Sequence, residues 1–167
     1  VYKRQLVAAS AALALADFPN RNIEIIHPWG PGNAMAMSQV VAKAMGEELG
    51  TDMPVISLPG AAGTKAQTTA MGKPANGYTI FDGYVAPLVL QPILGNADWN
   101  YKDFKPLSAA VANAFSIAGQ VDETRWSNFE EMMAYCQSNR GELRYSSGSR
   151  NNLPHMVIAK ALQGFDC

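Results

Sequence analysis

Two loops rich in small residues have the composition and spacing of anion-binding turns. Residues 28–34 read PWGPGNA and stand between a β-branched apolar run and a row of helix formers. Residues 146–152 read SSGSRNN and again stand between a predicted strand and a predicted helix. Such a turn exposes backbone N–H groups at a helix amino terminus, where these donors and the helix dipole favour an anion without lysine or arginine. Both loops therefore predict anion binding, although many α/β proteins use glycine at this position only to turn.

Four side chains in or near these loops are candidate ligand contacts, and three of them have an alternative role. The hydroxyl of Ser147 is expected to contact a ligand. Arg150 either pairs with a ligand carboxylate or lies solvated on its loop. Trp29 is either a wall of the site or part of the core. His155 is either a ligand contact or a packing or capping residue, and the second role is the commoner one for a histidine near a helix start.

Catalysis is the competing functional class. Ser147 and His155 stand eight residues apart with acidic residues elsewhere, so a hydrolase can be imagined. The sequence has no G-x-S-x-G, H-E-x-x-H or C-x-x-C motif and only two histidines. No metal-ligand spacing is present either. We therefore expect a protein that is not an enzyme and that needs neither a metal nor a cofactor.

Strand and helix patterns alternate around the first loop. Strands are predicted at residues 22–27, 54–58 and 78–83, and helices at 34–49, 64–71 and 86–94. In the first of these helices, Met37, Val40, Val41, Ala44, Met45 and Leu49 are predicted to form the buried face. A βαβαβα order indicates an α/β fold with a mostly parallel sheet and right-handed crossovers.

The pattern changes after residues 95–106, which are polar and rich in turn formers. Residues 107–121 are almost free of charge and predict one or two buried strands that cross between lobes. Ser127 and Glu130 form a predicted capping box for a helix that runs to about Ser138. A strand at 142–145 precedes a last helix with Pro154 in its first turn. We expect lobes at residues 17–112 and 113–167.

The amino terminus has the pattern of a secretory signal. Lys3 and Arg4 precede eleven apolar or small residues that end in the A-L-A site at residues 14–16. Residues 1–16 are therefore predicted to be a signal peptide, shortened at its front because the chain opens on Val1. Asp17 stands where a lipid-modified cysteine would otherwise follow, so a soluble exported protein is expected.

Composition and cysteine content exclude some classes of partner. The chain has 167 residues, with 13 basic and 14 acidic side chains and a net charge of -1. This balance provides no excess positive charge that would attract nucleic acid or an anionic membrane. Cys136 lies on a predicted helical stripe and is most simply a buried thiol, while Cys167 is the last residue. A disulfide between them is permitted in an exported protein.

Five segments, in order and spacing, resemble one family of transport proteins. They are residues 18–36, 58–64, 74–80, 101–109 and 127–148, followed by His155. Across nearly all of residues 18–165 the chain is similar to the substrate-binding proteins of tripartite tricarboxylate transporters, also called Bug receptors. The resemblance implies a monomeric periplasmic receptor with a periplasmic-binding-protein-like fold, whose two α/β lobes close over a small carboxylate. It also implies integral membrane permease subunits as partners.

The resemblance also assigns the ligand contacts to the two loops. Backbone amides, hydroxyls and bridging waters of these loops grip the carboxylate in the family. These contacts match residues 31–34 and 146–152 here. The predicted ligand contacts are Trp29, Pro31, Gly32, Asn33 and Ala34 in the first loop, and Ser146, Ser147, Gly148, Arg150 and Asn151 with His155 in and after the second. The output could equally be sensing, with the receptor docked on a membrane signalling protein.

Departures from the family pattern leave the ligand open. Asn33 replaces a second glycine, Ala36 an aspartate and Ser57 an asparagine. Asn33 remains a suitable helix N-cap that tolerates positive φ. The backbone N–H donors of the first loop, called the amide cradle below, are therefore expected to be retained. A citrate-like acid, a dicarboxylate, an aromatic carboxylate and an acidic amino acid all fit such a cradle.

The length of the chain suggests an amino-terminal part of such a receptor. Family members usually have about twice the mature length, and the parallel-sheet pattern stops at residues 165–167 where another strand is expected. The second lobe is therefore expected to be incomplete, with apolar surface exposed at Met156, Val157 and Leu162.

Overall fold

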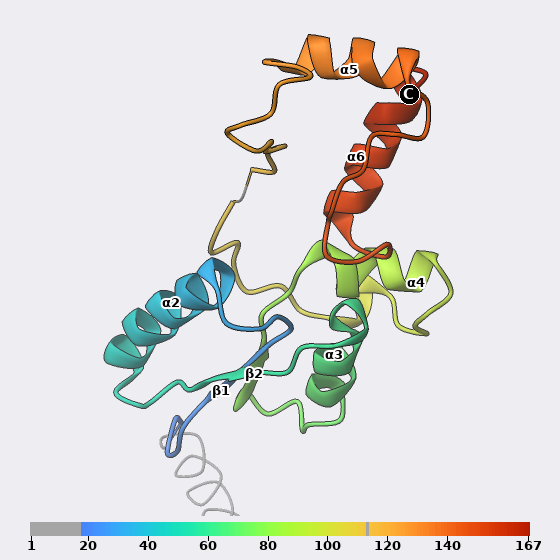
Figure 1. Cartoon of the computed structure of the whole chain (residues 1–167). Helices are drawn as coiled ribbons and strands as arrows, with labels where there is room; N and C mark the ends of the chain where they lie inside the picture. The colour runs from blue at the N-terminus through green and yellow to red at the C-terminus, as the bar shows by residue number, and fades with distance from the viewer. Residues whose placement is uncertain (1–17, 113) are drawn as a thin grey trace, which may run out of the picture. The chain divides into compact units, whose positions relative to one another are not determined.

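The computed structural model describes residues 18–112 and 114–167 (Figure 1). The predicted signal peptide lies outside these residues, as does Asn113, at the predicted domain boundary. The described chain forms two compact units, one ending at Tyr84 and the other beginning at Val85. This division falls earlier than the predicted one, and the assignment of 17–112 and 113–167 to two lobes stays a prediction.

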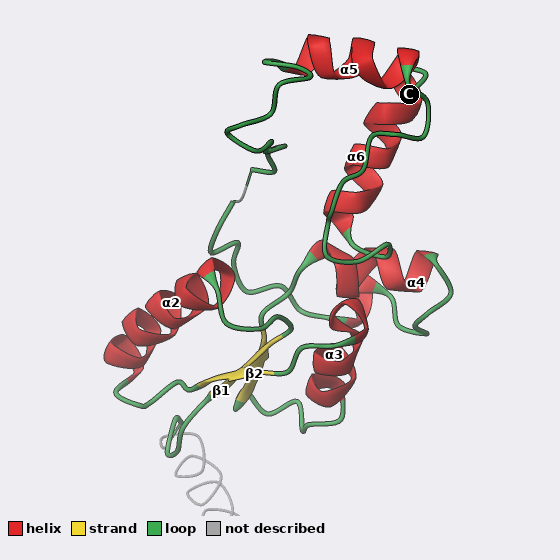
Figure 2. Ribbon diagram, in the orientation of Figure 1, coloured by secondary structure: helices red, strands yellow, loops and turns green. Residues whose placement is uncertain are grey.

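A parallel three-stranded sheet forms the centre of the first unit (Figure 2). Its strands are β1 (Glu24–His27), β2 (Val55–Ser57) and β3 (Thr79–Phe81), in the order β2-β1-β3. In the register of the sheet, Ile25 of β1 lies opposite Val55 and Ile80. Ile25 and Ile26 of the central strand point to opposite faces and are both buried, because helices cover both sides of such a sheet. The predicted α/β fold with a parallel sheet is confirmed.

Two helices connect these strands. They are α2 (Asn33–Leu49) and α3 (Thr64–Met71), the latter preceded by a single turn of 3-10 helix, η1 (Ala61–Gly63). The chain moves across the sheet in one direction from β1 to β2 and in the other from β2 to β3. Right-handed crossovers therefore place α2 and α3 on opposite faces, as Figure 2 shows.

The core of the first unit contains Ile23, Ile25, Ala42 and Met53. The prediction for the buried face of α2 is wrong in part, because Met37, Val40, Ala44 and Leu49 are exposed. Ala42 and Gly46 are the buried residues of this helix. A β-carbon on Gly46 would lie 2.7 Å from the carbonyl oxygen of Thr51, so the helix approaches the β2 side through its smallest residues.

Helices form the second unit. They are η2 (Ala86–Leu90), which is π-helical, α4 (Gln91–Ile93), the 3-10 turn η3 (Tyr101–Asp103), α5 (Phe129–Ser138) and α6 (Leu153–Gly164). Trp99 is buried and its indole N–H donates to the carbonyl of Pro87 at 2.9 Å. No helix among the described residues is long and apolar enough to cross a membrane.

Three predictions for the second unit are corrected by the structure. The strands expected within 107–121 and at 142–145 do not form, and Leu107, Phe115 and Val121 are exposed rather than buried. A strand needs a partner for its backbone N–H and C=O groups, and none pairs with these segments in the described chain. The cap of α5 is Asn128, whose side chain accepts from the N–H of Glu131, so the helix begins one residue later than predicted.

Two of the apolar residues of α6 that were expected to be exposed are exposed. Met156 and Val157 are exposed, while Leu162 is partly buried. Pro154 lies in the first turn of the helix, as predicted. The first turn tolerates proline because the N–H that proline lacks would have no helical partner there.

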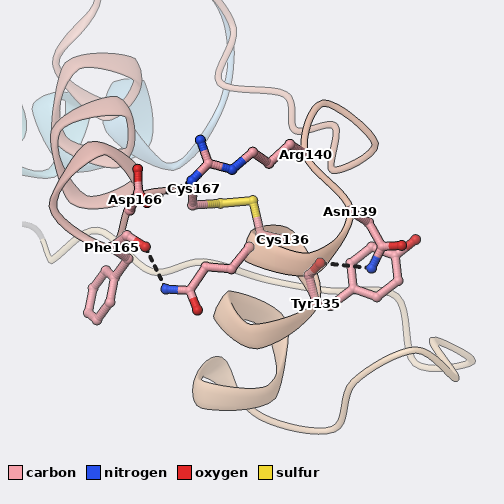
Figure 3. The surroundings of a disulfide bond; sticks show 8 residues. Tyr135, Cys136, Asn139, Arg140, Phe165, Asp166 and Cys167 are labelled. Atoms are coloured by element: carbon pink, nitrogen blue, oxygen red, sulfur yellow. Dashed lines mark hydrogen bonds and ion pairs between the residues drawn. A yellow bond between two sulfur atoms is a disulfide. The ribbon is translucent and has the colours of Figure 1, made fainter.

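A disulfide joins the two cysteines (Figure 3). The expectation that Cys136 is a free buried thiol is therefore wrong: it bonds to Cys167, with the two α-carbons 5.5 Å apart. Beside the disulfide, the side-chain amide of Gln137 donates to the carbonyl of Phe165 at 2.6 Å. Arg140 pairs with Asp166, also at 2.6 Å. The residues that follow α6 are thus fastened to the carboxyl-terminal part of α5.

Candidate functional site

The first predicted loop directly follows β1 and leads into α2 (Figure 1). Gly32 is the N-cap of α2, with an extended backbone (φ 160°), and no side chain caps the helix. The N–H of Ala36 makes the first helical hydrogen bond, to the carbonyl of Gly32 at 3.0 Å. The N–H groups of Asn33, Ala34 and Met35 are consequently the free donors of this helix start.

The environment of the loop suits an anion. Pro31, Gly32 and Asn33 are exposed, and a β-carbon built on Gly32 would have no atom within 4 Å. The first turn of α2 also contains no acidic residue. The prediction that Asn33 caps the helix is wrong, because Asn33 is the first helical residue and its φ is not positive. Its side chain leaves the backbone donors uncapped.

The strand order places this loop where ligands bind in related architectures. In sheets with the order β2-β1-β3, the crevice lies beyond the carboxyl ends of β1 and β3, where the crossovers diverge. Residues 28–32 follow β1 there, and residues 82–84 follow β3. The segment after β3 was not among the predicted site residues.

A polar cluster of His27, Ser38 and Asp82 lies at this edge, and the sequence did not predict it. His27 is completely buried, and its Nδ1 lies 2.7 Å from Oδ2 of Asp82. The hydroxyl of Ser38 reaches the same carboxylate oxygen, and it lies 3.1 Å from the carbonyl of Ala34. The cluster therefore ties the start of α2 to the ends of β1 and β3.

The geometry of this cluster is not that of a catalytic triad. In a Ser-His-Asp triad, the carboxylate and the hydroxyl bind opposite ring nitrogens of the histidine. Here Ser38 Oγ lies 3.2 Å from Nδ1, the nitrogen that also faces Asp82. The other nitrogen, Nε2, is buried and has no hydrogen-bond partner in the described chain. The cluster orients backbone elements and does not activate the serine.

Two aromatic rings stand beside the cluster. Tyr84 meets the ring of Trp29 edge-on, with 5.6 Å between centroids, and the ring of His27 at 5.9 Å. Both Trp29 and Tyr84 are partly exposed, and a role of Trp29 as a wall of the site stays a prediction. Burial raises the pKa of the Tyr84 phenol and the charge of Asp82 raises it further, which keeps the hydroxyl protonated.

In the second predicted loop, Asn152 caps the start of α6. The side-chain oxygen of Asn152 accepts from the N–H of His155 at 3.0 Å and caps α6, while its amide donates to the carbonyl of Ser147. Gly148 adopts a left-handed conformation (φ 81°) that permits the turn. The ring of His155 stacks on Tyr145, with its Nδ1 2.9 Å from the phenol oxygen. His155 thus packs on Tyr145, and a ligand contact by this residue stays a prediction.

The other predicted residues of this loop are exposed. Ser146, Gly148, Arg150 and Asn151 all have accessible surface, and Ser147 is half-buried. The carbonyl of Asn151 accepts from the buried amide of Gln91 at 2.8 Å, which anchors the loop to α4. The predicted residues thus gather in two loops, one in each unit, and their joint action on one ligand stays a prediction.

Two further features bear on the assignment of the site. No group of three or more acidic, histidine or cysteine side chains in the described residues could hold a metal. An open depression of about 1130 Å³ lies near the other end of α2, lined by Arg21, Lys43, Glu47 and Asp52 among others. It is broad and of mixed charge, and neither predicted loop contributes to it.

Comparisons with known proteins identify relatives at low identity. The chain is 28% identical over 153 residues to a UPF0065 protein of Bordetella pertussis, covering 90% of this chain and 47% of the relative. It is 24% identical over 157 residues to a UPF0065 protein from the tcbD-tcbE intergenic region of a Pseudomonas species, covering 91% and 46%. The chain thus spans about half the length of the curated relatives it matches. No protein-family model matches it.

A solved structure described as a periplasmic transporter has the same fold. It superposes with a TM-score of 0.73 at 20% identity, covering 89% of this chain and 51% of that one. This match supports the predicted periplasmic-binding-protein-like α/β fold. Together with the UPF0065 relatives it is in line with the predicted resemblance to the Bug receptor family.

Proposed function

We propose that the protein is a periplasmic solute receptor that binds a small carboxylate and delivers it to the permease subunits of a tripartite tricarboxylate-type transporter. The observation that carries this proposal is the uncapped start of α2, which follows an uncharged Gly/Pro loop at the carboxyl edge of the sheet. Similarity to a periplasmic transporter and to UPF0065 proteins supports the class of function.

On the first loop, the carboxylate accepts hydrogen bonds from the N–H groups of Asn33 and Ala34. The helix behind these donors has 17 residues, so its dipole is fully developed. Pro31 and Gly32 present little side chain in front of the donors, and Trp29 forms a wall. An anion is bound in this way without a formal positive charge.

The second loop contributes different donors. The hydroxyl of Ser147 and the backbone of Ser146 and Gly148 offer hydrogen bonds of ordinary strength. Arg150 offers a planar guanidinium that matches a carboxylate in a two-point pair. Asn151 supplies its side-chain amide, since its backbone is engaged with α4 and Ser149. His155 contributes through Nε2, the nitrogen that Tyr145 does not use.

Ligand screening tests this proposal. Citrate, succinate, glutarate, benzoate and glutamate are added singly to the purified protein, and the melting temperature and the heat of binding are measured. A ligand that binds only the folded state at 100 times its Kd stabilises that state by about 2.7 kcal/mol. We expect at least one acid to raise the melting temperature and to give saturable heat, while succinamide gives neither. If every acid behaves like succinamide, the receptor proposal is wrong.

A further inference from the structure

Asp82 has an unusual position for an aspartate beside an anion site. The segments that directly follow the three strands are residues 28–32, 58–63 and 82–84, and Asp82 is their only charged residue. The segments at the edge of the sheet where a ligand is expected therefore carry one carboxylate and no lysine or arginine. A ligand that is only anionic would be repelled by this charge.

From this arrangement we propose that the ligand is an amino carboxylate: its carboxylate binds the start of α2, and its ammonium group binds Asp82 beside the Trp29–Tyr84 pair. This inference rests on the proposed function, since it requires a carboxylate on the first loop. It selects one chemical class among the acids that the amide cradle admits, namely molecules that carry both charges.

The carboxylate of Asp82 lies close to the amide cradle. Ser38 Oγ reaches Oδ2 of Asp82 and lies 3.1 Å from the carbonyl of Ala34, which belongs to the first turn of α2. The Ser38 side chain therefore bridges the Asp82 carboxylate and the first turn of α2, where the anion is proposed to bind. A separation of one bridging side chain suits a molecule whose ammonium and carboxylate are separated by one or a few carbons.

Asp82 also retains the capacity to bind a cation. Its Oδ2 is shared by Ser38 and by His27 Nδ1, but Oδ1 makes no hydrogen bond in the described chain. The side chain keeps 25% of its surface exposed. Because an ionised carboxylate has about four acceptor positions, an ammonium can be added without displacing either protein donor.

The aromatic rings complete the environment of an ammonium. Trp29 and Tyr84 are partly exposed and meet edge-on at 5.6 Å, and Tyr84 lies close enough to Asp82 for the carboxylate charge to raise the pKa of its phenol. The faces of Trp and Tyr rings attract a cation that lies within about 6 Å of the ring centroid. A carboxylate beside such a pair of rings favours an ammonium over a neutral hydroxyl or a second carboxylate.

Matched pairs of ligands isolate the contribution of the ammonium. Aspartate is compared with succinate, glutamate with glutarate, and phenylalanine with 3-phenylpropionate, by calorimetry at one pH and ionic strength. In each pair the two molecules differ only in the α-amino group. We expect the amino member of at least one pair to bind about tenfold more tightly, or better, as one favourable charge contact implies.

Two variants assign that preference to Asp82. Asp82→Asn keeps an acceptor for His27 but removes the charge, and it should bring the two members of a pair to within about threefold of each other. Asp52→Asn is the matched control, since Asp52 is exposed and precedes β2 at the opposite edge of the sheet. It should keep the full preference. Circular dichroism checks that both variants are folded, and Trp29→Leu replaces Asp82→Asn if that variant unfolds.

The possible outcomes separate the amino carboxylate inference from the proposed function as a carboxylate receptor. Tighter binding of the amino member, lost in Asp82→Asn and kept in Asp52→Asn, supports the inference. Equal or tighter binding of the plain acids overturns the inference but leaves the carboxylate receptor intact, and so does a preference that survives in Asp82→Asn. If no member of any pair binds, the inference is overturned, and the proposed function falls with it only if citrate and benzoate do not bind either.

Discussion

Gly32 provides the most direct residue-scale test of the amide cradle. Its extended φ of 160° is accessible to any residue, and an added β-carbon would meet no atom within 4 Å. We therefore expect Gly32→Val to fold normally while its side chain covers the N–H groups of Asn33 and Ala34. Carboxylate affinity should fall about tenfold or more, because a backbone donor is lost to the ligand.

Calorimetry with the acid that binds best measures this change, and a melting curve checks the fold. Gly119→Val is the matched control, since Gly119 is exposed, has open space around it and belongs to the second unit. Unchanged affinity in a folded Gly32→Val protein would contradict the cradle at α2.

Ser38 offers a residue-scale test of the His27 cluster. Its hydroxyl reaches the carboxylate of Asp82 and thereby joins α2 to the end of β3. Ser38→Ala should lower the free energy of unfolding by about 1–3 kcal/mol, since a hydrogen bond to a charged group is lost at a partly buried position. Urea unfolding measures the difference.

Thr69→Ala is the control for Ser38→Ala. The Thr69 hydroxyl binds the carbonyl of Lys65 within its own helix and is exposed. Its loss should change the free energy of unfolding by less than about 0.5 kcal/mol. Equal effects of the two substitutions would show that the cluster does not couple the elements.

The sequence predicted the small residues of the site but not its buried polar ones. Gly32 and Pro31 are visible because a strand-to-helix break has a distinctive composition. His27, Ser38 and Asp82 are separated by 11 to 55 residues, and no local spacing connects them. One signal was available: His27 ends an apolar strand and Asp82 follows another, and the carboxyl ends of adjacent parallel strands meet at one edge.

At the scale of elements, the predicted strands are correct where a β-branched run also finds a partner strand in the sheet. β1, β2 and β3 are short β-branched runs between turn signals, and each finds its parallel partner within the first unit. Residues 107–121 have equally low charge but form no strand, because composition does not specify a pairing partner. The same limit applies to α2, where several apolar positions are exposed and Gly46 is buried instead.

The start of α5 provides an element-scale prediction on pH. Hydrogen bonds from the backbone N–H and hydroxyl of Ser127 lower the pKa of Glu131 below its ordinary value. A carboxyl whose pKa is lowered in the folded state contributes stability above its ordinary pKa and loses it as the pH falls through the lowered value. The cap of α5 should therefore loosen only in acid.

Carbon-detected NMR titration of the Glu131 carboxyl measures this pKa. We expect a value below that of an unperturbed glutamate. Ser127→Ala should move it part of the way back, because the backbone donor remains. A Glu131 that titrates normally in the folded protein would rule out this capping contact.

At the scale of the whole molecule, the resemblance of five separated segments to one family predicted more than any single pattern. It led to the parallel sheet and the periplasmic-binding-protein-like fold, which the solved transporter structure supports. It did not predict the helical character of the second unit or the division at Tyr84 and Val85. Those features depend on which segments pair, and pairing is decided by contacts far apart in the sequence.

The disulfide between Cys136 and Cys167 is a covalent link between residues that are 31 positions apart in the sequence. It fastens the residues after α6 to the end of α5, where Arg140 and Asp166 also pair. Closing a loop of this length reduces the entropy of the unfolded chain and stabilises the folded state by about 3–4 kcal/mol. Cys136→Ser should therefore lower the melting temperature markedly, and dithiothreitol should do the same to the unmodified protein.

The effects of removing the two cysteines should not add. Cys136→Ser, Cys167→Ser and the double variant each break the same bond, so their melting temperatures should agree closely, and dithiothreitol should change none of them. A thiol assay should find no free cysteine in the native protein and one in each single variant. If the single variants melt like the unmodified protein, or if native protein exposes two reactive thiols, the residues after α6 are not held to α5 by this bond.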